Sequence, residues 1–465
     1  MKKIHVTLPR LVATALMGWL AVNTAVTSLA DTSVPGTRKS PDWLRSAVVY
    51  EIFPRNFSQA GDFNAITAQL DELHQLGINV LWLMPVQPTG EKLKKGSLGS
   101  PFAVRDFYAI NPNYGTTNDF KQLIAGAHQR GQKVILDIVA SHTSWDSVLM
   151  EQHPDFYMKG TNGAVIPPEP GWTDVAGLDY ANPAVRAYMI DMMKFWLTAY
   201  GVDGFRCDVA PNVPVAFWEA ARTELEKVNP DVVILADAGA KPELLVKAFD
   251  VDSSWAMINT LDSVMSSLVP AYYIKESWMH TDQQYPKGAM HLRFTDNHEE
   301  TRAIARYGVN GALASQVLML TLDGVPLFYN GMEVGDATES ADPALFEKMP
   351  VFWNPGGRPP LRDIYRDVIK LRKQYSAIHN GEVIWPQNTS PGEVVSFLRQ
   401  DAKDQFLVLI NLSSRKASGS VDIDDAGSFE LVNISGMAKP PVDTHLPDFV
   451  LNGYGWHIYH RPTPK

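Results

Sequence analysis

Four short segments of this chain end a hydrophobic run with carboxylate or histidine side chains. They are Asp137–His142, Gly204–Asp208, Ile234–Asp237 and Phe294–Glu299. In a barrel of parallel strands, chemistry is concentrated where the strands end, at the C-terminal mouth. Carboxylates that share such a pocket can act as nucleophile and as general acid or base. We therefore expect these segments to form one site for nucleophilic and acid–base chemistry.

Asp208 is the strongest candidate for the nucleophile. It stands two residues after Arg206, and residues two apart on a strand point to the same face. A fixed guanidinium favours the ionised form of a neighbouring carboxylate, so Arg206 is expected to keep Asp208 deprotonated. Cys207 lies between them and is interpreted as a packing residue. It is the only cysteine, so no intrachain disulfide can form.

The elements that must position these residues follow a regular pattern. Short apolar runs alternate with longer amphipathic stretches, which indicates βα units and a parallel sheet. Helices are expected at 66–76, 120–130, 185–199 and 215–228. Eight strands predict an α/β fold with a closed (β/α)8 barrel. The expected strands are Val48–Phe53, Val80–Met84, Val134–Val139, Gly204–Val209, Val232–Ala236, Phe249–Ser253, Met290–Thr295 and Pro326–Tyr329.

Two regions depart from this pattern. A long segment rich in Pro, Gly and Trp interrupts the barrel after its third strand, and such long connections are usually functional. Towards the C-terminus, short runs at 394–399, 406–411, 419–423, 429–432 and 457–459 predict an antiparallel β-sandwich. The expected organisation is a signal peptide (1–30), a mobile tail (31–42), the barrel (43–142 and 184–378), a small excursion (143–183) and the sandwich (379–465).

The order and spacing of the four motifs resemble those of the α-amylase superfamily, glycoside hydrolase family 13. The resemblance implies an aspartate nucleophile, a glutamate acid/base and an aspartate that stabilises the transition state. The matching residues here are Asp208, Asp237 and Glu299, so the last two carboxylates have exchanged lengths. Asp237 has roughly 1.5 Å less reach than a glutamate acid, and proton transfer depends on reach. We interpret the exchange as compensatory, with decay of catalysis as the alternative.

The resemblance also implies a set of substrate-binding residues. His142 and His298 match the two family histidines that bond sugar hydroxyls at the cleavage subsite. Asp137 matches a partner that orients Arg206. Phe102 stands where the family has a tyrosine under the sugar, which keeps the apolar platform and removes the hydroxyl. The small excursion occupies the place of the family's domain B.

No cofactor or metal is expected. The family's calcium site uses an Asn before the first histidine, an Asp in the domain B segment and a carbonyl after the nucleophile motif. This chain has Ser141 and Gly177 at the first two places and Asn212 near the third. Calcium takes six to eight oxygen ligands, which these residues do not readily supply. We therefore predict that the family calcium site is absent.

Composition and the N-terminus indicate an exported protein. Lys2 and Lys3, an apolar stretch at 11–30 and Ser28-Leu-Ala30 form a signal-peptide pattern with cleavage after Ala30. An uncleaved anchor is the alternative. Cleavage would change the formal charge from −10 to −13, which argues against nucleic-acid or anionic-lipid partners but not against a neutral sugar. The expected location is periplasmic or extracellular, without membrane attachment.

The sequence therefore predicts a secreted retaining glycosidase acting on α-glucans or α-glucosides. Two alternatives remain open. One is an oligosaccharide-binding protein with impaired catalysis, and the other is a transglycosylase or isomerase of the same family. Linkage, chain length and oligomeric state do not follow from the sequence.

Overall fold

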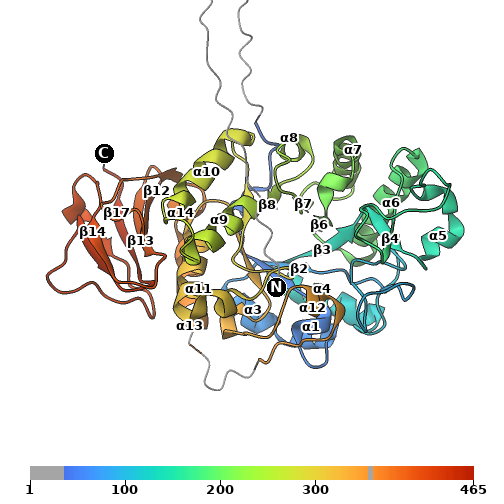
Figure 1. The fold of residues 1–465 in the computed structure, drawn as a ribbon, viewed down its shortest axis with the longest axis horizontal. Helices are drawn as coiled ribbons and strands as arrows, with labels where there is room; N and C mark the ends of the chain where they lie inside the picture. The colour runs from blue at the N-terminus through green and yellow to red at the C-terminus, as the bar shows by residue number, and fades with distance from the viewer. Residues whose placement is uncertain (1–35, 354–358, 360, 465) are drawn as a thin grey trace, which may run out of the picture. The chain divides into compact units, whose positions relative to one another are not determined.

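A closed barrel of eight parallel strands positions the site residues (Figure 1). The computed structural model describes residues 36–353, 359 and 361–464, so the predicted signal peptide lies outside the described residues. All eight predicted barrel strands are confirmed, and their order around the barrel is β1-β10-β9-β8-β7-β6-β3-β2. Their bounds are β1 Val49–Ile52, β2 Val80–Leu83, β3 Lys133–Val139, β6 Gly204–Asp208, β7 Val233–Ala236, β8 Val251–Ser253, β9 His291–Arg293 and β10 Val325–Tyr329.

Helices lie between the barrel strands as predicted, with one difference. The expected helix at 66–76 is two helices that meet at Gln69, whose N–H bonds back to the carbonyl of Ile66. The helix after β2 starts at a capping box, in which Thr116 and Asp119 satisfy each other's backbone N–H groups. The helices are α1 Pro54–Phe57, α2 Phe63–Ala68, α3 Leu70–Leu76, α4 Thr117–Gln129, α5 Val148–Gln152, α6 Pro183–Tyr200, α7 Val215–Glu226, α8 Leu244–Lys247, α9 Trp255–Met265, α10 Tyr273–Gln284, α11 Ala303–Thr321, α12 Asp342–Phe346, α13 Leu361–Gln374 and α14 Ser376–His379.

Strand register places the chemical groups beside one another. Asp137 on β3 is the register partner of Arg206 on β6. At the start of β6, a Cβ on Gly204 would lie 2.0 Å from the carbonyl oxygen of Val233 on β7, so only glycine permits this close approach. Cys207 is fully buried, in agreement with its interpretation as a packing residue.

The long segment after β3 forms a small antiparallel excursion. Strands β4 His142–Ser144 and β5 Val175–Gly177 pair with each other, with His142 opposite Gly177. His142 therefore belongs to this excursion rather than to the barrel strand that precedes it.

The C-terminal region is a five-stranded antiparallel sheet, ordered β11-β12-β13-β17-β15, with a separate pair β14-β16. The predicted fold class is confirmed. Sequence patterning missed β11 and β16, which are short and partly exposed. Helix α14 contacts β12 and β13 of this sheet (Figure 1, orange to red). The bounds are β11 Glu382–Ile384, β12 Val394–Gln400, β13 Asp404–Asn411, β14 Ala417–Ser420, β15 Glu430–Leu431, β16 Asp448–Leu451 and β17 Trp456–Pro462.

The described part of the segment predicted as a mobile tail is held by ionic contacts. Arg38 pairs with Glu226 at 2.6 Å and also with Asp250, which is buried. Across the described residues, no helix is both long enough and apolar enough to cross a membrane.

Candidate active site

The predicted site residues meet at the C-terminal ends of the barrel strands. Phe102, His142, Asp208 and Glu299 line one cavity of about 200 Å³. Asp137, Arg206 and His298 are buried and bonded to one another or to these lining residues. Asp237 directly follows β7 and joins the same bonded set, but it is not among the residues that line the cavity.

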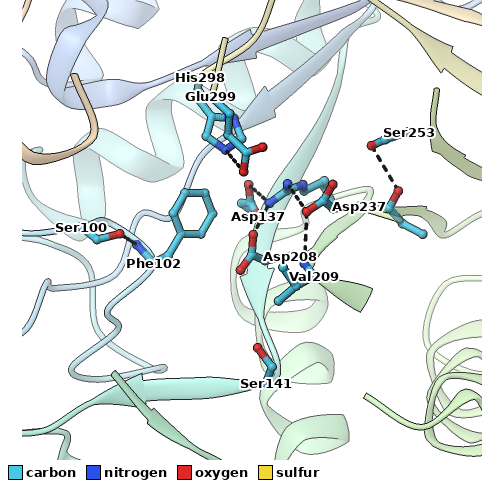
Figure 2. A network of polar contacts seen from close by, with 12 residues as sticks. Ser100, Phe102, Asp137, Ser141, Asp208, Val209, Asp237, Ser253, His298 and Glu299 are labelled. Carbon is cyan, nitrogen blue, oxygen red and sulfur yellow. Dashed lines mark hydrogen bonds and ion pairs between the residues drawn. The ribbon is translucent and has the colours of Figure 1, made fainter. Parts of the chain in front are cut away.

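Arg206 is the centre of the polar network, and one guanidinium serves three carboxylates. Its Nη1 lies 3.0 Å from Asp137 Oδ1 and 2.8 Å from Asp208 Oδ1. Its Nη2 lies 2.9 Å from Asp237 Oδ2. All four side chains are buried, and Figure 2 shows the three aspartates gathered around these bonds. The set therefore carries more negative charge than its one guanidinium compensates.

This excess changes the protonation of Asp208. Burial raises the pKa of Asp208 to about 8, and the charges of Asp137, Asp237 and Glu299 act in the same direction. Arg206 lowers that pKa but does not overcome the other effects. Burial and the neighbouring carboxylates therefore oppose the predicted effect of Arg206 on Asp208. The physical cause is that the guanidinium is shared among three carboxylates and that these carboxylates are desolvated.

Asp237 is held by donors on both of its oxygens. Oδ2 accepts from the backbone N–H of Val209 at 3.2 Å and pairs with Arg206. Oδ1 accepts from Trp255 Nε1 at 3.2 Å. Asp237 is therefore held by Arg206, Val209 and Trp255, and its carboxyl group does not line the cavity (Figure 2).

Glu299, unlike Asp237, faces the cavity. Its side chain is 41% exposed, lines the cavity and lies 3.5 Å from His298 Nε2 through Oε1. Burial tends to raise the pKa of Glu299, but His298 and Arg206 outweigh it and lower the pKa to about 2. Burial lowers the pKa of His298, but Glu51 and Glu299 outweigh burial and raise that pKa to about 10. Glu299 is therefore ionised and accessible, beside an imidazolium.

The remaining binding residues form the cavity wall. Phe102 packs against His298 with ring centroids 5.3 Å apart, so its face is an apolar platform next to the charged groups. His142 shares a 2.8 Å hydrogen bond with Ser141 and meets the ring of Trp172 edge-on at 5.6 Å. Burial lowers the pKa of His142 to about 4, so it is neutral at pH 7. Asp174 completes this side of the wall.

Sequence reasoning missed three residues that hold the site in place. Glu51 on β1 fixes His298 and is fully buried. Trp82 on β2 donates from Nε1 to Asp137 Oδ2 at 3.1 Å, and Trp255 on α9 bonds Asp237. The available signal for Glu51 was a lone carboxylate inside the apolar strand Val48–Phe53, because a buried acid needs a partner. The two tryptophans carry no comparable signal.

The positions of the family's calcium ligands do not fit a calcium ion in this chain. Ser141 Oγ is engaged by His142. A Cβ added at Gly177 would lie 2.8 Å from Met158 Sδ and 3.0 Å from the nitrogen of Pro168, so the place of a carboxylate is already filled. No group of three or more His, Cys, Asp or Glu side chains suited to a metal occurs among the described residues. The absence of bound calcium stays a prediction.

Comparison with known proteins agrees with this architecture. A family profile described as "Alpha amylase, catalytic domain" matches residues 45–168 and 170–404. A cyclomaltodextrinase from Geobacillus thermopakistaniensis is 25% identical over 470 residues, which covers 90% of this chain and 78% of that protein. A noncanonic maltogenic alpha-amylase from Thermotoga neapolitana superposes with a TM-score of 0.80 at 28% identity, covering 90% of this chain and 100% of the other. For an alpha-amylase from Lactobacillus plantarum the TM-score is 0.78 at 27% identity, with coverages of 90% and 99%.

Proposed function

Because the chain belongs to the α-amylase family of glycoside hydrolases, we propose that it cleaves α-glucosidic bonds in short α-linked glucans by double displacement. The observation that carries the proposal is one cavity in which Asp208 and Glu299 face an apolar platform, Phe102, and a neutral histidine, His142. Relatives named cyclomaltodextrinase and maltogenic alpha-amylase support an oligosaccharide substrate. The cavity volume of about 200 Å³ suits a short segment of sugar.

Double displacement needs one carboxylate without a proton and one with a proton. The set around Arg206 retains a proton near neutral pH, because burial and like charges raise the pKa of Asp208. We assign Asp208 as the nucleophile in its ionised form and Asp237 as the acid/base. Glu299, His298 and His142 bind the sugar hydroxyls. The proton must then reside on Asp237 when Asp208 attacks.

The position of Asp237 makes protonation of the leaving group the slow step. Asp237 accepts N–H bonds on both oxygens and stands outside the cavity lining. Well-placed acid catalysis contributes about 10²–10⁴ in rate, so a poorly placed acid loses much of that factor. Substrates with good leaving groups are therefore expected to react faster than maltodextrins.

The same observation favours a second candidate, an oligosaccharide-binding protein with little turnover. The cavity wall would still bind sugar through Phe102, His142 and Glu299, while Asp237 remains an ionic partner of Arg206. The two functions share the site and differ only in whether the glycosidic bond breaks.

Product analysis distinguishes the candidates. Purified protein is incubated with maltodextrins, cyclodextrins, starch, trehalose and sucrose, and products are separated by chromatography. Hydrolysis that Asp208→Asn abolishes supports the enzyme. Sugar binding by calorimetry without products supports the binding protein, whereas longer or rearranged products indicate transfer to a sugar. If the protein forms no products and binds no sugar, both candidates are overturned.

Export is a further part of the proposal. The basic residues Lys2 and Lys3 and the apolar stretch ending at Ala30 support a cleaved signal peptide. Intact-mass measurement on protein recovered outside the cytoplasm should give a chain beginning at Asp31. A full-length N-terminus in that fraction would contradict cleavage.

A further inference from the structure

A second cavity of about 200 Å³ lies at the opposite end of the barrel from the candidate active site. It is bounded by the N-terminal ends of β9 and β10, by helix α10 and by strands β11 and β12 of the C-terminal sheet. Residues 35–465 form one compact unit, so this junction is internal to the fold. The residues that matter here are Trp278, Arg293, Asp323 and Arg399.

Arg399 is the unusual member of this cavity. The residue is fully buried, and its Nε, Nη1 and Nη2 have no hydrogen-bond partner among the described residues. It lines the cavity from strand β12, where its backbone pairs in register with Val383 and Phe406. A guanidinium presents five N–H donors, and burying these donors without hydrogen-bond partners costs free energy.

The surrounding charges do not balance Arg399. Arg293 is already paired with Asp323, through Nη2 to Oδ1 at 3.1 Å and through Nε to the backbone oxygen at 3.0 Å. Asp323 Oδ1 also accepts from Trp278 Nε1 at 2.8 Å. Arg372 is buried nearby and donates to backbone carbonyls, so no carboxylate neutralises it. Three buried guanidiniums thus face one aspartate.

The guanidinium of Arg399 keeps its charge despite this environment. Burial lowers the pKa of Arg399 to about 10, and Asp323 partly opposes that effect. The group is still protonated at neutral pH. Two further acids, Asp282 and Glu382, line the cavity, but both are exposed and lie in solvent at the rim. The interior therefore has donors and positive charge without a matching acceptor.

We propose that this cavity binds a small inorganic oxyanion, of the phosphate or sulfate class, with Arg399 as its main ligand. Guanidinium N–H groups match the oxygens of such anions in a bidentate geometry, which a spherical halide does not offer. The volume admits one tetrahedral anion with a few waters, since a water takes about 30 Å³ in the liquid. Bound anion would join β9 and β10 to the C-terminal sheet. The site is independent of the proposed catalytic function.

Isothermal titration calorimetry of the full chain with inorganic phosphate tests the proposal. Sodium chloride at matched ionic strength is the comparison. We expect saturable binding of phosphate with one site per chain, weakened at least tenfold in Arg399→Met. Arg415→Met is the matched control, because Arg415 is 78% exposed in the connection between β13 and β14 and its substitution should leave the affinity unchanged.

Asp323→Asn provides an independent test, in which the phosphate affinity is expected to change in the opposite direction. It removes the one carboxylate near Arg399 while keeping an acceptor for Trp278, so phosphate should bind more tightly. The measurement on Asp323→Asn also tests the site if Arg399→Met does not fold. Equal affinity in wild type and both variants, or no saturable binding in any of them, would overturn the site. Chloride binding as tight as phosphate would overturn the assignment to an oxyanion.

Discussion

At the scale of single residues, the active-site chemistry depends on how the N–H groups of one guanidinium are shared among three carboxylates. Arg206 bonds Asp137, Asp208 and Asp237. Side-chain length, which differs by one methylene between aspartate and glutamate, decides which carboxylate reaches the guanidinium. The shortened acid is drawn back to Arg206, and the lengthened Glu299 reaches into the cavity. The exchange therefore places the longer carboxylate in the cavity and the shorter one beside Arg206.

Restoring the length of the acid should raise activity. In Asp237→Glu the extra methylene can carry the carboxyl past Arg206 towards the cavity, where it can protonate a leaving oxygen. We expect kcat/KM on maltodextrins to rise tenfold or more, a barrier change of about 1.4 kcal/mol. Sequence reasoning favoured compensation and a loss, but the bonds of Asp237 favour the gain.

The double variant separates the two explanations. If the exchange is compensatory, Asp237→Glu alone lowers kcat/KM, and Asp237→Glu with Glu299→Asp recovers more than the sum of the single effects. A lowered kcat/KM in the single variant would contradict our expectation. Circular dichroism of each variant checks that the fold is retained.

The pH dependence follows from the raised pKa of Asp208. A nucleophile must be ionised, so kcat/KM for a glucosyl fluoride, whose leaving group needs no acid, should rise as pH passes through about 8. In Asp237→Asn one like charge is removed, which lowers the pKa of Asp208 and moves this rise to lower pH. The profile of kcat/KM against pH measures both.

A control for this shift is Asp71→Asn, which removes the same charge from an exposed pair with Arg130. Its profile should match that of the wild type. A wild-type rise centred near pH 4 would instead mean that Arg206 keeps Asp208 ionised.

The motifs predicted which residues gather, but not how they share bonds. Asp137, Arg206, Asp208 and Asp237 were found because each lies in or just after the C-terminal half of a strand in a recognisable barrel. Their protonation depends on distances of about 3 Å between side chains from three strands, which no local pattern encodes.

At the scale of elements, strand spacing and register position the network. Asp137 and Arg206 are partners across β3 and β6, and β6 and β7 approach closely at Gly204. The eight barrel strands could be predicted because short, mostly apolar runs alternate with longer amphipathic stretches. Strands β11 and β16 could not, because they are short and partly exposed, and their stability comes from pairing.

Gly204→Ala should disturb both the barrel and the site. Its Cβ would meet the backbone of Val233, which cannot move aside as a side chain can. We expect the free energy of unfolding to fall by about 1–3 kcal/mol, as in other overpacked interiors. Urea unfolding followed by tryptophan fluorescence measures it.

Gly427→Ala is the matched control, because nothing lies within 4 Å of a Cβ at that position. It should change the unfolding free energy little. Equal effects of the two substitutions would mean that β6 and β7 separate without cost.

At the scale of the whole molecule, the fold is expected to hold without calcium. The excursion is closed by the pairing of His142 with Gly177 and by Met158, which fills the place of a carboxylate ligand. Treatment with a chelator should therefore leave the melting temperature and the activity unchanged. A fall of several degrees that added calcium reverses would contradict this prediction, since a ligand bound only to the native state raises its stability.

The single buried cysteine gives the catalytic strand its own reporter. Cys207 stands between Arg206 and Asp208, and burial raises the pKa of its thiol well above the usual value. An alkylating reagent can reach this sulfur only in molecules whose β6 has opened. Since no other thiol exists in the chain, the rate of labelling under native conditions would measure how often the strand that carries the nucleophile detaches from the barrel.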